Sequence, residues 1–324
     1  MRYDLIVIGN DEAAFEILCA AGAAGQRAIG VLPEQRHSAW MMGQALLRLT
    51  SEMMADRSAH RGLLRQQTGT PRLLRRLIAN ALTQEISYHL QILERVGVET
   101  ILGEARVLTR NSVVVTSGID CQRTTLHATN LVIGTGIRRT AMHRPLGLLP
   151  LHNPETLLSG IRMPKALCLL GGDDLGSGLA ALFSLFQVDT MLVAHDESPG
   201  ALLELARAAG VRIGPHPSDQ DVTGDFSTWK DRADVVDCRR AAGFTDHLGL
   251  PAIGIEPDEH GRLWCAANLE TWCEGVFGIG EVVGFSSQIA KHPTEQANRV
   301  INRILHRIPR PHFLRTRVGA FASL

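Results

Sequence analysis

The stretch Gly9-Asn10-Asp11-Glu12-Ala13-Ala14 follows an apolar run, Tyr3 to Ile8, and opens a segment rich in Ala and Leu that ends at Gly25. Arg27 to Leu32 is the next apolar run. A strand, a turn, a helix and a second strand within about 30 residues are typical of a βαβ unit, whose crossover is right-handed. The order therefore predicts that the chain begins with a parallel α/β unit.

The same order returns in the middle of the chain. Gly171-Gly172-Asp173-Asp174-Leu175-Gly176 lies between an apolar run, Ala166 to Leu170, and a helical segment, Leu179 to Phe186, and Thr190 to Ala194 follows. Two such units predict an α/β fold with two Rossmann-like domains. We expect residues 1–150 together with 250–324 to form the first domain, which is discontinuous, and residues 151–249 to form a shortened second domain inserted in it.

Both turns resemble the dinucleotide fingerprint G-x-G-x-x-G/A. In that fingerprint the first Gly makes the tight turn, the second lets a diphosphate approach the backbone, and the third packs the helix on the strand. Gly9 and Ala14 fill the first and third positions of one copy, and Gly171 and Gly176 fill those of the other. The second position is aspartate in both copies. Each aspartate places a side chain and a negative charge where two phosphate charges would lie, so that ordinary diphosphate binding is opposed.

Asp11 and Asp173 have two interpretations. As helix N-caps, they need only a side-chain acceptor aimed at free backbone N–H groups, and each carboxylate would then replace the phosphate at the anion site. Alternatively, they bind a ribose hydroxyl, a cation or a protonated ligand.

Composition excludes several classes of function. The chain has 324 residues with 33 Lys and Arg against 33 Asp and Glu, so no net charge attracts nucleic acid or anionic lipid, and we expect neither as a partner. The six cysteines are scattered, and neither they nor the histidines show metal-ligand spacing. We therefore expect no metal site and no disulfide framework.

The ends of the chain carry further expectations. The first predicted strand begins within three residues of Met1, which leaves no room for a secretory signal, and no apolar run is long enough to span a membrane. We therefore expect a cytoplasmic protein. After Glu295 the chain contains no acid and six arginines: Arg299, Arg303, Arg307, Arg310, Arg315 and Arg317. This tail is either an arm that binds a protein partner or a helix that covers the first domain.

Between the two units, Pro71 to Val96 has apolar residues at helical spacing and arginines on the other face, which predicts a long amphipathic helix. A further helix is expected at Ala201 to Ala209. Short strands are expected at Thr100 to Leu102, Arg106 to Leu108, Val113 to Thr116, Leu131 to Ile133 and Val276 to Ile279.

Two further motifs occur in order along the chain. Leu131-Val132-Ile133-Gly134-Thr135-Gly136-Ile137-Arg138 looks like a strand that ends in A-T-G, and Val276-Phe277-Gly278-Ile279-Gly280-Glu281 looks like a closing G-D flavin motif. With the two turns, this ordered set resembles the pyridine nucleotide-disulfide oxidoreductases, and most closely the soluble pyridine nucleotide transhydrogenases. The resemblance covers nearly the whole chain.

The resemblance implies a flavin domain split around a nicotinamide domain, with hydride passing from NAD(P)H to FAD and on to an acceptor that is not a disulfide. The residues that it assigns to FAD are Gly9, Asp11, Ala14, Thr135, Gly136, Gly280 and Glu281, with Glu34 as a substitute for the ribose-binding acid. Those that it assigns to NAD or NADP are Gly171, Asp173, Gly176 and Asp196. The resemblance identifies no catalytic side chain.

The sequence departs from the family pattern in several places. No cysteine lies between Cys19 and Cys121, which excludes dithiol chemistry. The family's Lys beside the flavin falls near Gln44, and the Glu after its nicotinamide fingerprint is Gly178. The sequence stops at Leu324, where the family continues into a dimerisation domain. These departures support a rival hypothesis, a flavin-free relative that keeps the fold as a binding or interaction scaffold.

Overall fold

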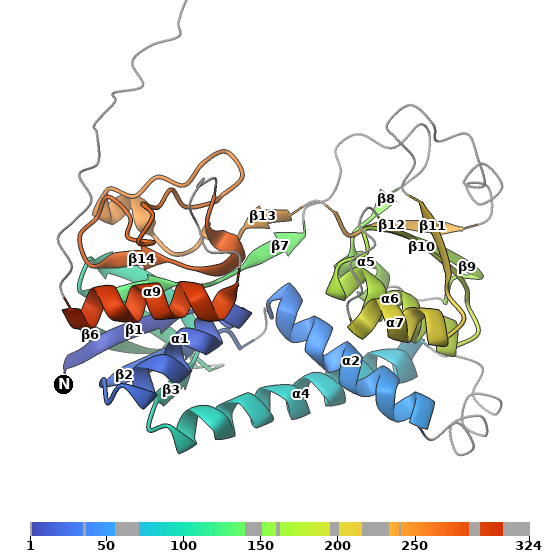
Figure 1. Cartoon of the computed structure of the whole chain (residues 1–324), viewed down its shortest axis with the longest axis horizontal. Coiled ribbons are helices and arrows are strands. Elements are labelled where there is room, and N and C mark those ends of the chain that lie inside the picture. The colour runs from blue at the N-terminus through green and yellow to red at the C-terminus, as the bar shows by residue number, and fades with distance from the viewer. Residues whose placement is uncertain are drawn as a thin grey trace, which may run out of the picture.

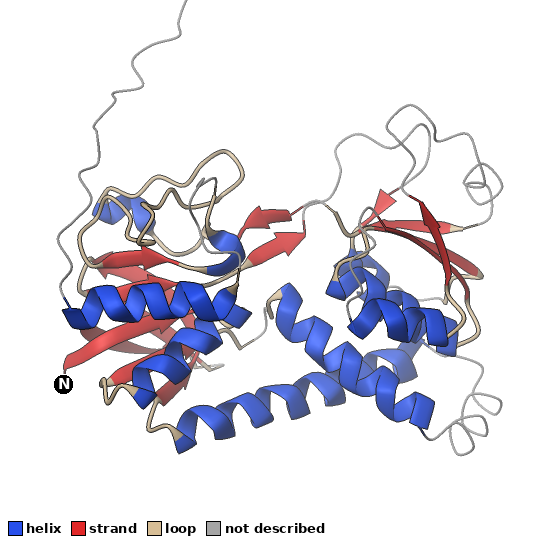
Figure 2. Cartoon of the chain, viewed as in Figure 1, coloured by secondary structure: helices blue, strands red, loops and turns tan. Residues whose placement is uncertain are grey.

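The computed structural model describes residues 2–34, 37–55, 71–118, 120–139, 151–159, 163–194, 201–215, 233–239, 241–284 and 292–306. Two sheets, each with helices against it, lie side by side, and the long helices α2 (Ala39–Ala55) and α4 (Pro71–Arg95) run below and between them (Figure 1). The α/β fold with Rossmann-like sheets that the sequence predicts is confirmed (Figure 2).

The strands of the first sheet have the order β3-β2-β1-β6-β5-β4, with β14 paired to β6. The strands are β1 (Arg2–Ile8), β2 (Ala28–Leu32), β3 (Glu99–Leu102), β4 (Glu104–Thr109), β5 (Ser112–Ser117), β6 (Gln122–Ile133) and β14 (Val276–Gly278). β2, β1, β6 and β14 run parallel, whereas β4, β5 and β6 form an antiparallel meander. The carboxyl ends of the parallel strands therefore meet at one edge, next to the first turn.

Helix α1 (Glu12–Ala23) and helix α9 (Pro293–His306) cover one face of this sheet. Because side chains alternate along a strand, Leu5 and Val7 pack beneath α1 while Ile6 and Ile8 pack on the other face. α1 ends where Gly25 takes a φ of +68°, a left-handed conformation that glycine adopts without strain. α9 includes Arg299 and Arg303, so the first part of the arginine-rich tail is a helix on the first sheet, and residues 307–324 lie outside the described residues.

The second sheet has the order β11-β10-β9-β12-β8, and these neighbouring strands pair in parallel. Its strands are β8 (Leu151–His152), β9 (Ala166–Leu170), β10 (Asp189–Ala194), β11 (Arg212–Pro215) and β12 (Asp234–Asp237), with helices α5 (Pro154–Ser159), α6 (Asp174–Leu185) and α7 (Ala201–Ala208). β7 (Ile137–Arg139) and β13 (Ala241–Gly243) pair antiparallel in the connection between the sheets. The division into 1–150 with 250–324 and 151–249 stays a prediction.

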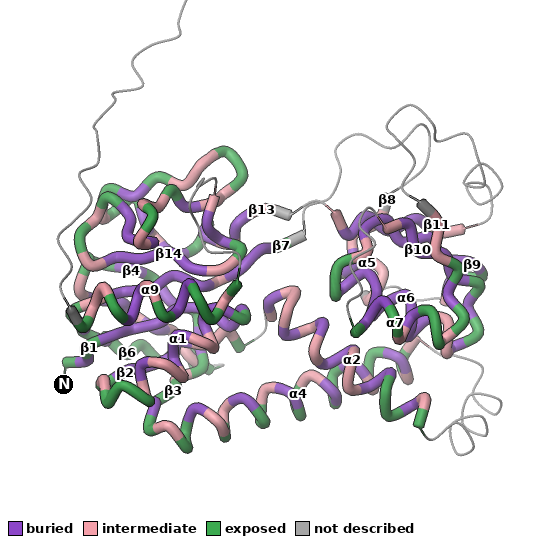
Figure 3. The backbone as a smooth tube through the Cα atoms, in the orientation of Figure 1, coloured by how far each residue is buried: buried purple, intermediate pink, exposed green. Residues whose placement is uncertain are grey.

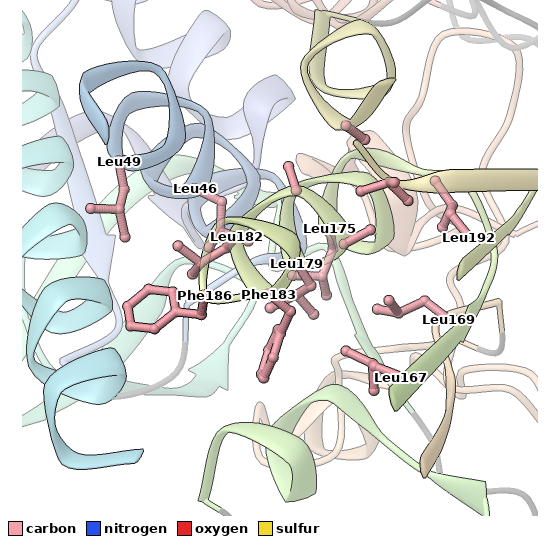
Figure 4. Close-up of a cluster of buried hydrophobic side chains, with 14 of the residues drawn as sticks. Leu46, Leu49, Leu167, Leu169, Leu175, Leu179, Leu182, Phe183, Phe186 and Leu192 are labelled. Carbon is pink, nitrogen blue, oxygen red and sulfur yellow. The ribbon is translucent and has the colours of Figure 1, made fainter. Parts of the chain in front are cut away.

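Helix α2, which was not predicted from the sequence, packs against α6 of the second sheet. Their contact is close because glycines face it: a Cβ at Gly178 would lie 2.9 Å from the Cβ of Leu46, and one at Gly43 would lie 3.1 Å from that of Asp174. Leu46 and Leu49 of α2 therefore share one buried cluster with side chains of α6, β9 and β10 (Figure 4). Helix α2, which follows β2 of the first sheet in the chain, thus completes the buried cluster on the second sheet.

Helix α4 confirms the predicted amphipathic helix. Its buried residues, Leu74, Ile78, Ala81, Glu85, His89 and Leu93, recur at helical spacing. Its arginines at the amino-terminal end are exposed, and Figure 3 shows exposed residues along the whole helix. The predicted strands are also present, and most of their boundaries differ by one or two residues, because strand ends depend on local hydrogen bonding that periodicity does not report. The strand predicted at Leu131 to Ile133 is much longer, since β6 begins at Gln122.

Candidate nucleotide sites

The first turn retains the backbone geometry of a dinucleotide fingerprint. Gly9 has a φ of +122°, and a Cβ on it would lie 2.0 Å from the carbonyl oxygen of Gly134. A Cβ on Gly134 would in turn lie 2.8 Å from the Cβ of Ala14. Small residues at these positions therefore let β1, α1 and the end of β6 pack closely.

Asp11 is the N-cap of α1, as the first interpretation predicted. Its Oδ1 accepts a hydrogen bond of 2.8 Å from the backbone amide of Ala14, and the residue is 2% exposed. Its Oδ2 has no hydrogen-bond partner and lies against Gly280, where a Cβ would be only 1.9 Å away. The carboxyl group is therefore enclosed between the start of α1 and the segment after β14.

The charge of Asp11 differs from what the sequence suggested. Burial raises its pKa to about 8, the amide of Ala14 opposes this rise, and the nearby carboxylate of Glu281 adds to it. Asp11 is thus mostly protonated at neutral pH. Its side chain opposes a diphosphate by occupying the Ala14 amide at the start of α1 rather than by a full negative charge.

Asn10 and Ser38 hold the first turn to the start of α2. The amide of Ser38 donates to Asn10 Oδ1 at 3.1 Å, and the Ser38 hydroxyl donates to the Asn10 carbonyl at 2.8 Å. Ser38 Oγ also accepts from the amide of Met41 at 3.1 Å, as an N-cap does. Neither residue was predicted from the sequence; the serine just before an apolar helical pattern was the signal that could have revealed α2 and its cap.

The second turn has the same backbone geometry but a different environment for its aspartate. Gly171 has a φ of +113°, and a Cβ on Gly176 would lie 2.1 Å from the carbonyl oxygen of Gly171. Asp173 Oδ1 accepts from the amide of Gly176 at 2.9 Å, so Asp173 is also an N-cap. Unlike Asp11, Asp173 is exposed, and its side chain can rotate away at the cost of one cap, about 1 kcal/mol.

Arg239 lies beside the second turn, at the carboxyl end of β12, and was not among the predicted residues. Its side chain lies close to Gly171, because a Cβ there would be 2.9 Å from Arg239 Cγ. The buried carboxylate of Asp237 accepts from Arg239 Nε at 3.0 Å and from Nη2 at 3.2 Å. A guanidinium is thus held in a fixed position near a turn where the fingerprint binds phosphate.

A cavity of about 390 Å³ joins the two turns, and we call it the acidic cavity. The acidic residues that line it are Asp11, Glu12, Asp173, Asp174 and Glu281. Burial, followed by neighbouring carboxylates, raises the pKa of Glu12 and of Asp174. The tertiary structure therefore brings together the predicted residues of both turns and of the closing motif.

Comparisons with known proteins agree with this architecture. No family model matches the chain. The soluble pyridine nucleotide transhydrogenase of Hahella chejuensis is 25% identical over 322 residues, covering 88% of this chain and 67% of that protein. The soluble pyridine nucleotide transhydrogenase of Chromohalobacter salexigens is 25% identical over 319 residues, covering 88% of this chain and 67% of that protein.

Solved structures of the same architecture cover almost the whole chain. The Cu(II) complex of the HOCl-induced flavoprotein disulfide reductase RclA from Escherichia coli superposes with a TM-score of 0.60 at 17% identity, over 94% of this chain and 71% of that one. LpdA from Mycobacterium tuberculosis superposes with a TM-score of 0.61 at 18% identity, over 97% and 74%. The chain is therefore similar in sequence to soluble pyridine nucleotide transhydrogenases and shares the fold of these flavoprotein structures, which supports the resemblance to the pyridine nucleotide-disulfide oxidoreductase superfamily.

The superfamily's FAD site can be tested against the residues present. At the first turn the Ala14 amide is engaged by Asp11, and Gly280 is packed on the same carboxyl group. Two adjoining cavities beside Gly9 and Asn10 measure only about 40 and 30 Å³, whereas small-molecule sites usually measure roughly 300–1,000 Å³. The residues at the first turn therefore do not fit the diphosphate and adenosine of FAD in this arrangement.

The other residues that the superfamily pattern assigns to FAD or to the nicotinamide nucleotide lie in different surroundings. Gly136 lies next to Asp11, and the amide of Gly280 donates to Gln296 Oε1 at 2.7 Å. Glu34 Oε1 accepts from the amide of Gly118 at 2.9 Å, so this carboxylate contacts the turn between β5 and β6. Asp196 lies outside the described residues.

Metal ligands and membrane spans are both absent from the part of the chain that the structure describes. Across the ranges given above, no group of three or more His, Cys, Asp or Glu side chains could hold a metal ion. Among the helices described, none is both long enough and apolar enough to cross a membrane.

Proposed function

We propose that the protein is a pyridine nucleotide oxidoreductase of the transhydrogenase-like kind, and that it takes NAD or NADP at the turn between β9 and α6. The exposed position of Asp173 carries this proposal, because rotation of this side chain frees the Gly176 amide that it caps. The relatives named soluble pyridine nucleotide transhydrogenase, which align with 88% of the chain, support the redox activity.

In this proposal the chain's own residues position the nucleotide. Gly171 and Gly176 let the diphosphate approach the backbone and the positive end of α6. Arg239 offsets part of the phosphate charge, and Asp196 takes the ribose hydroxyls. When bound, the nicotinamide supplies the hydride.

In a more specific form of this proposal, FAD binds in the first domain. The hydride then passes to FAD and on to an acceptor that is not a disulfide. This form requires Asp11 to leave its buried position. The buried Asp11 therefore favours a second candidate, a flavin-free member that keeps the fold as a binding or interaction scaffold.

Nucleotide binding is tested by titrating the fluorescence of NADH and of NADPH with the purified protein. We expect wild type to bind one of them, Asp173→Gly to bind it more tightly, and Gly176→Val to lose binding, because a side chain there meets the Gly171 carbonyl. Asp11→Gly is the matched control at the other turn and should leave this affinity unchanged. Absence of binding in both wild type and Asp173→Gly would contradict the proposal.

The two candidates are separated by flavin uptake. Wild type, Asp11→Gly and Asp173→Gly are incubated with excess FAD, passed through gel filtration and examined by visible absorption. Flavin bands in wild type, with flavin-dependent NAD(P)H oxidation, support the more specific form. A spectrum that is flat in wild type and Asp173→Gly but shows flavin in Asp11→Gly supports the flavin-free candidate.

A further inference from the structure

The strand order of the second sheet reverses between β9 and β12. The chain adds β10 and then β11 on one side of β9, and β12 afterwards pairs with β9 on its other side. In open parallel sheets, ligands bind outside the carboxyl ends of the strands at the point where the order reverses in this way. Gly171 follows the carboxyl end of β9, and Arg239 follows that of β12. The backbone amide of Cys238 donates to the carbonyl of Leu170 at 2.8 Å, so the two strand ends are adjacent.

Arg239 is held in one orientation by Asp237. The carboxylate of Asp237 accepts hydrogen bonds from the Arg239 backbone amide at 3.0 Å, from Nε at 3.0 Å and from Nη2 at 3.2 Å. The contact uses the edge of the guanidinium formed by Nε and Nη2, so Nη1 points away from the carboxylate. The side chain of Asp237 is 3% exposed, whereas that of Arg239 is 25% exposed. A buried acid therefore fixes a basic group that a ligand can still reach from solvent.

Gly171 lets this arginine approach the second turn. A Cβ on Gly171 would lie 2.9 Å from Arg239 Cγ and 3.3 Å from the Arg239 backbone nitrogen. Gly171 also has a φ of +113°, which a residue with a side chain adopts only with strain. Both the turn and the arginine beside it thus require glycine at this position. The fingerprint binds a diphosphate against the backbone of this turn, so the guanidinium lies next to the phosphate position.

A fixed arginine at this place favours a diphosphate over a single phosphate group. An unrestrained arginine loses rotamer freedom when it binds a ligand, whereas Arg239 has already lost much of it on folding. The second turn then offers two anchors, which are the amides at the start of α6 and the guanidinium of Arg239. One phosphate group can engage one of these anchors, and two linked phosphate groups can engage both.

Charge alone predicts the opposite role for Asp237. Its carboxylate lies near the phosphate position and repels an anion there, so removing it would tighten binding if the net charge of the site decided affinity. If the orientation of Arg239 decides affinity, removing the carboxylate weakens binding, because the guanidinium loses the two contacts that direct it. The sign of this single change therefore separates positioning from charge.

We propose that Arg239 makes the second turn selective for nucleoside diphosphates, and that Asp237 is the positioning residue that orients Arg239 for this contact. The amides at the start of α6 hold one phosphate group, and Arg239 holds the other. The inference rests on the proposed function, since the diphosphate is that of NAD or NADP, and it adds which side chains discriminate between ligands.

The test compares three adenine nucleotides on the purified full chain by isothermal titration calorimetry. ADP carries two linked phosphate groups, AMP carries one, and adenosine 3′,5′-bisphosphate carries two that are not linked. We expect ADP to bind at least about tenfold more tightly than either of the others, which corresponds to about 1.4 kcal/mol. Equal affinities for the three nucleotides overturn the selectivity.

Variants of Arg239 assign the selectivity to this side chain. Arg239→Gln should weaken ADP about tenfold and AMP less than about twofold, because only the second anchor is lost. Arg239→Lys keeps the charge without the planar guanidinium and should recover only part of the ADP affinity. Urea unfolding shows that each variant is folded. Damage to the fold would weaken both nucleotides alike, so the ratio of the ADP and AMP affinities measures the contact itself, and an unchanged ratio in Arg239→Gln overturns the role of Arg239.

Arg212 provides a matched control in the same sheet. It pairs with Asp189 at the amino ends of β11 and β10, whereas the second turn lies at the carboxyl ends of the strands. Arg212→Gln therefore removes an arginine of an Arg–Asp pair far from the phosphate position along the strands, and it should change neither the ADP nor the AMP affinity.

The positioning role is tested by Asp237→Asn. This change should weaken ADP about threefold in wild type, and it should not weaken ADP in the Arg239→Gln background, where no guanidinium is left to orient. Tighter binding of ADP by Asp237→Asn overturns the positioning role.

Titrations with NADH and NADPH separate this inference from the proposed function. If one of them binds and Arg239→Gln does not weaken it, the proposed function stands and this inference fails. If ADP binds through Arg239 and neither NADH nor NADPH binds, the proposed function fails and the diphosphate contact stands. If none of the three binds, both fail.

Discussion

Asp11 and Asp173 are the same residue type at the same position of two equivalent turns, and each caps a helix through an amide three residues later. They differ in what covers them. Asp11 is enclosed by Gly280 and by the end of β6, whereas Asp173 faces solvent. The two aspartates look alike in the sequence, but only the buried one is fixed in place.

Burial of Asp11 predicts a pH dependence of stability. The pKa of Asp11 in the folded protein, about 8, lies above its ordinary value of 3.8, so the folded protein holds this proton more tightly than the unfolded chain. Both states are protonated below the ordinary value, and the free energy of unfolding falls as the pH rises from there towards 8, by about 1.4 kcal/mol for each pH unit. Asp11→Asn keeps the cap and has no proton to lose. Urea unfolding should show wild type losing more stability between pH 4 and pH 8 than Asp11→Asn, and parallel curves would contradict this.

The contact between Asp11 and Gly280 predicts a coupling between the two residues. Gly280→Ala places a Cβ 1.9 Å from Asp11 Oδ2 and also strains a φ of +75°, so it should destabilise the fold by about 2–4 kcal/mol. In the Asp11→Gly background the clash is absent and only the backbone strain remains. The cost of Gly280→Ala should therefore be at least about 1 kcal/mol smaller in that background. Equal costs in the two backgrounds, measured by denaturant unfolding, would show that the two residues do not touch.

At the scale of elements, the contact between α2 and α6 is the feature that was not predicted from the sequence. Gly→Ala in a helix normally stabilises by about 1 kcal/mol. Gly178→Ala should nevertheless destabilise, by about 1–3 kcal/mol, because its Cβ lies 2.9 Å from that of Leu46 in a closely packed cluster. Gly43→Ala is the matched control on α2, where the nearest side-chain atom is 3.1 Å away, and it should cost less. A rise in the urea midpoint of Gly178→Ala would refute this account of the packing.

At the scale of the whole molecule, the two nucleotide turns should respond differently to their ligands. A ligand that binds only the folded state at 100 times its Kd stabilises it by about 2.7 kcal/mol. Thermal unfolding should therefore show a higher Tm with the nicotinamide nucleotide that binds, and the flavin-free candidate predicts no change with FAD. In Asp11→Gly, the same candidate predicts that FAD raises the Tm. A rise with FAD in wild type would instead favour the flavin-dependent candidate.

The sequence alone determined the two βαβ units and both of their βα turns. Apolar runs such as Tyr3 to Ile8 and Ala166 to Leu170, each followed by glycine and a helical pattern, specify β1 and β9 locally. Asp11 and Asp173 could be predicted as N-caps for the same reason, since a cap depends on residues within one turn of the helix. Apolar residues that recur at helical spacing over a long stretch likewise specified α4.

Only the tertiary structure decided what surrounds these local features. The burial of Asp11, its raised pKa and its contact with Gly280 depend on a segment almost at the other end of the chain. The positions of Arg239, Ser38 and Thr135 around the two turns also depend on long-range packing, which periodicity does not encode. Exposure is a property of the assembled core, so the same aspartate became a fixed internal cap in one domain and an accessible one in the other.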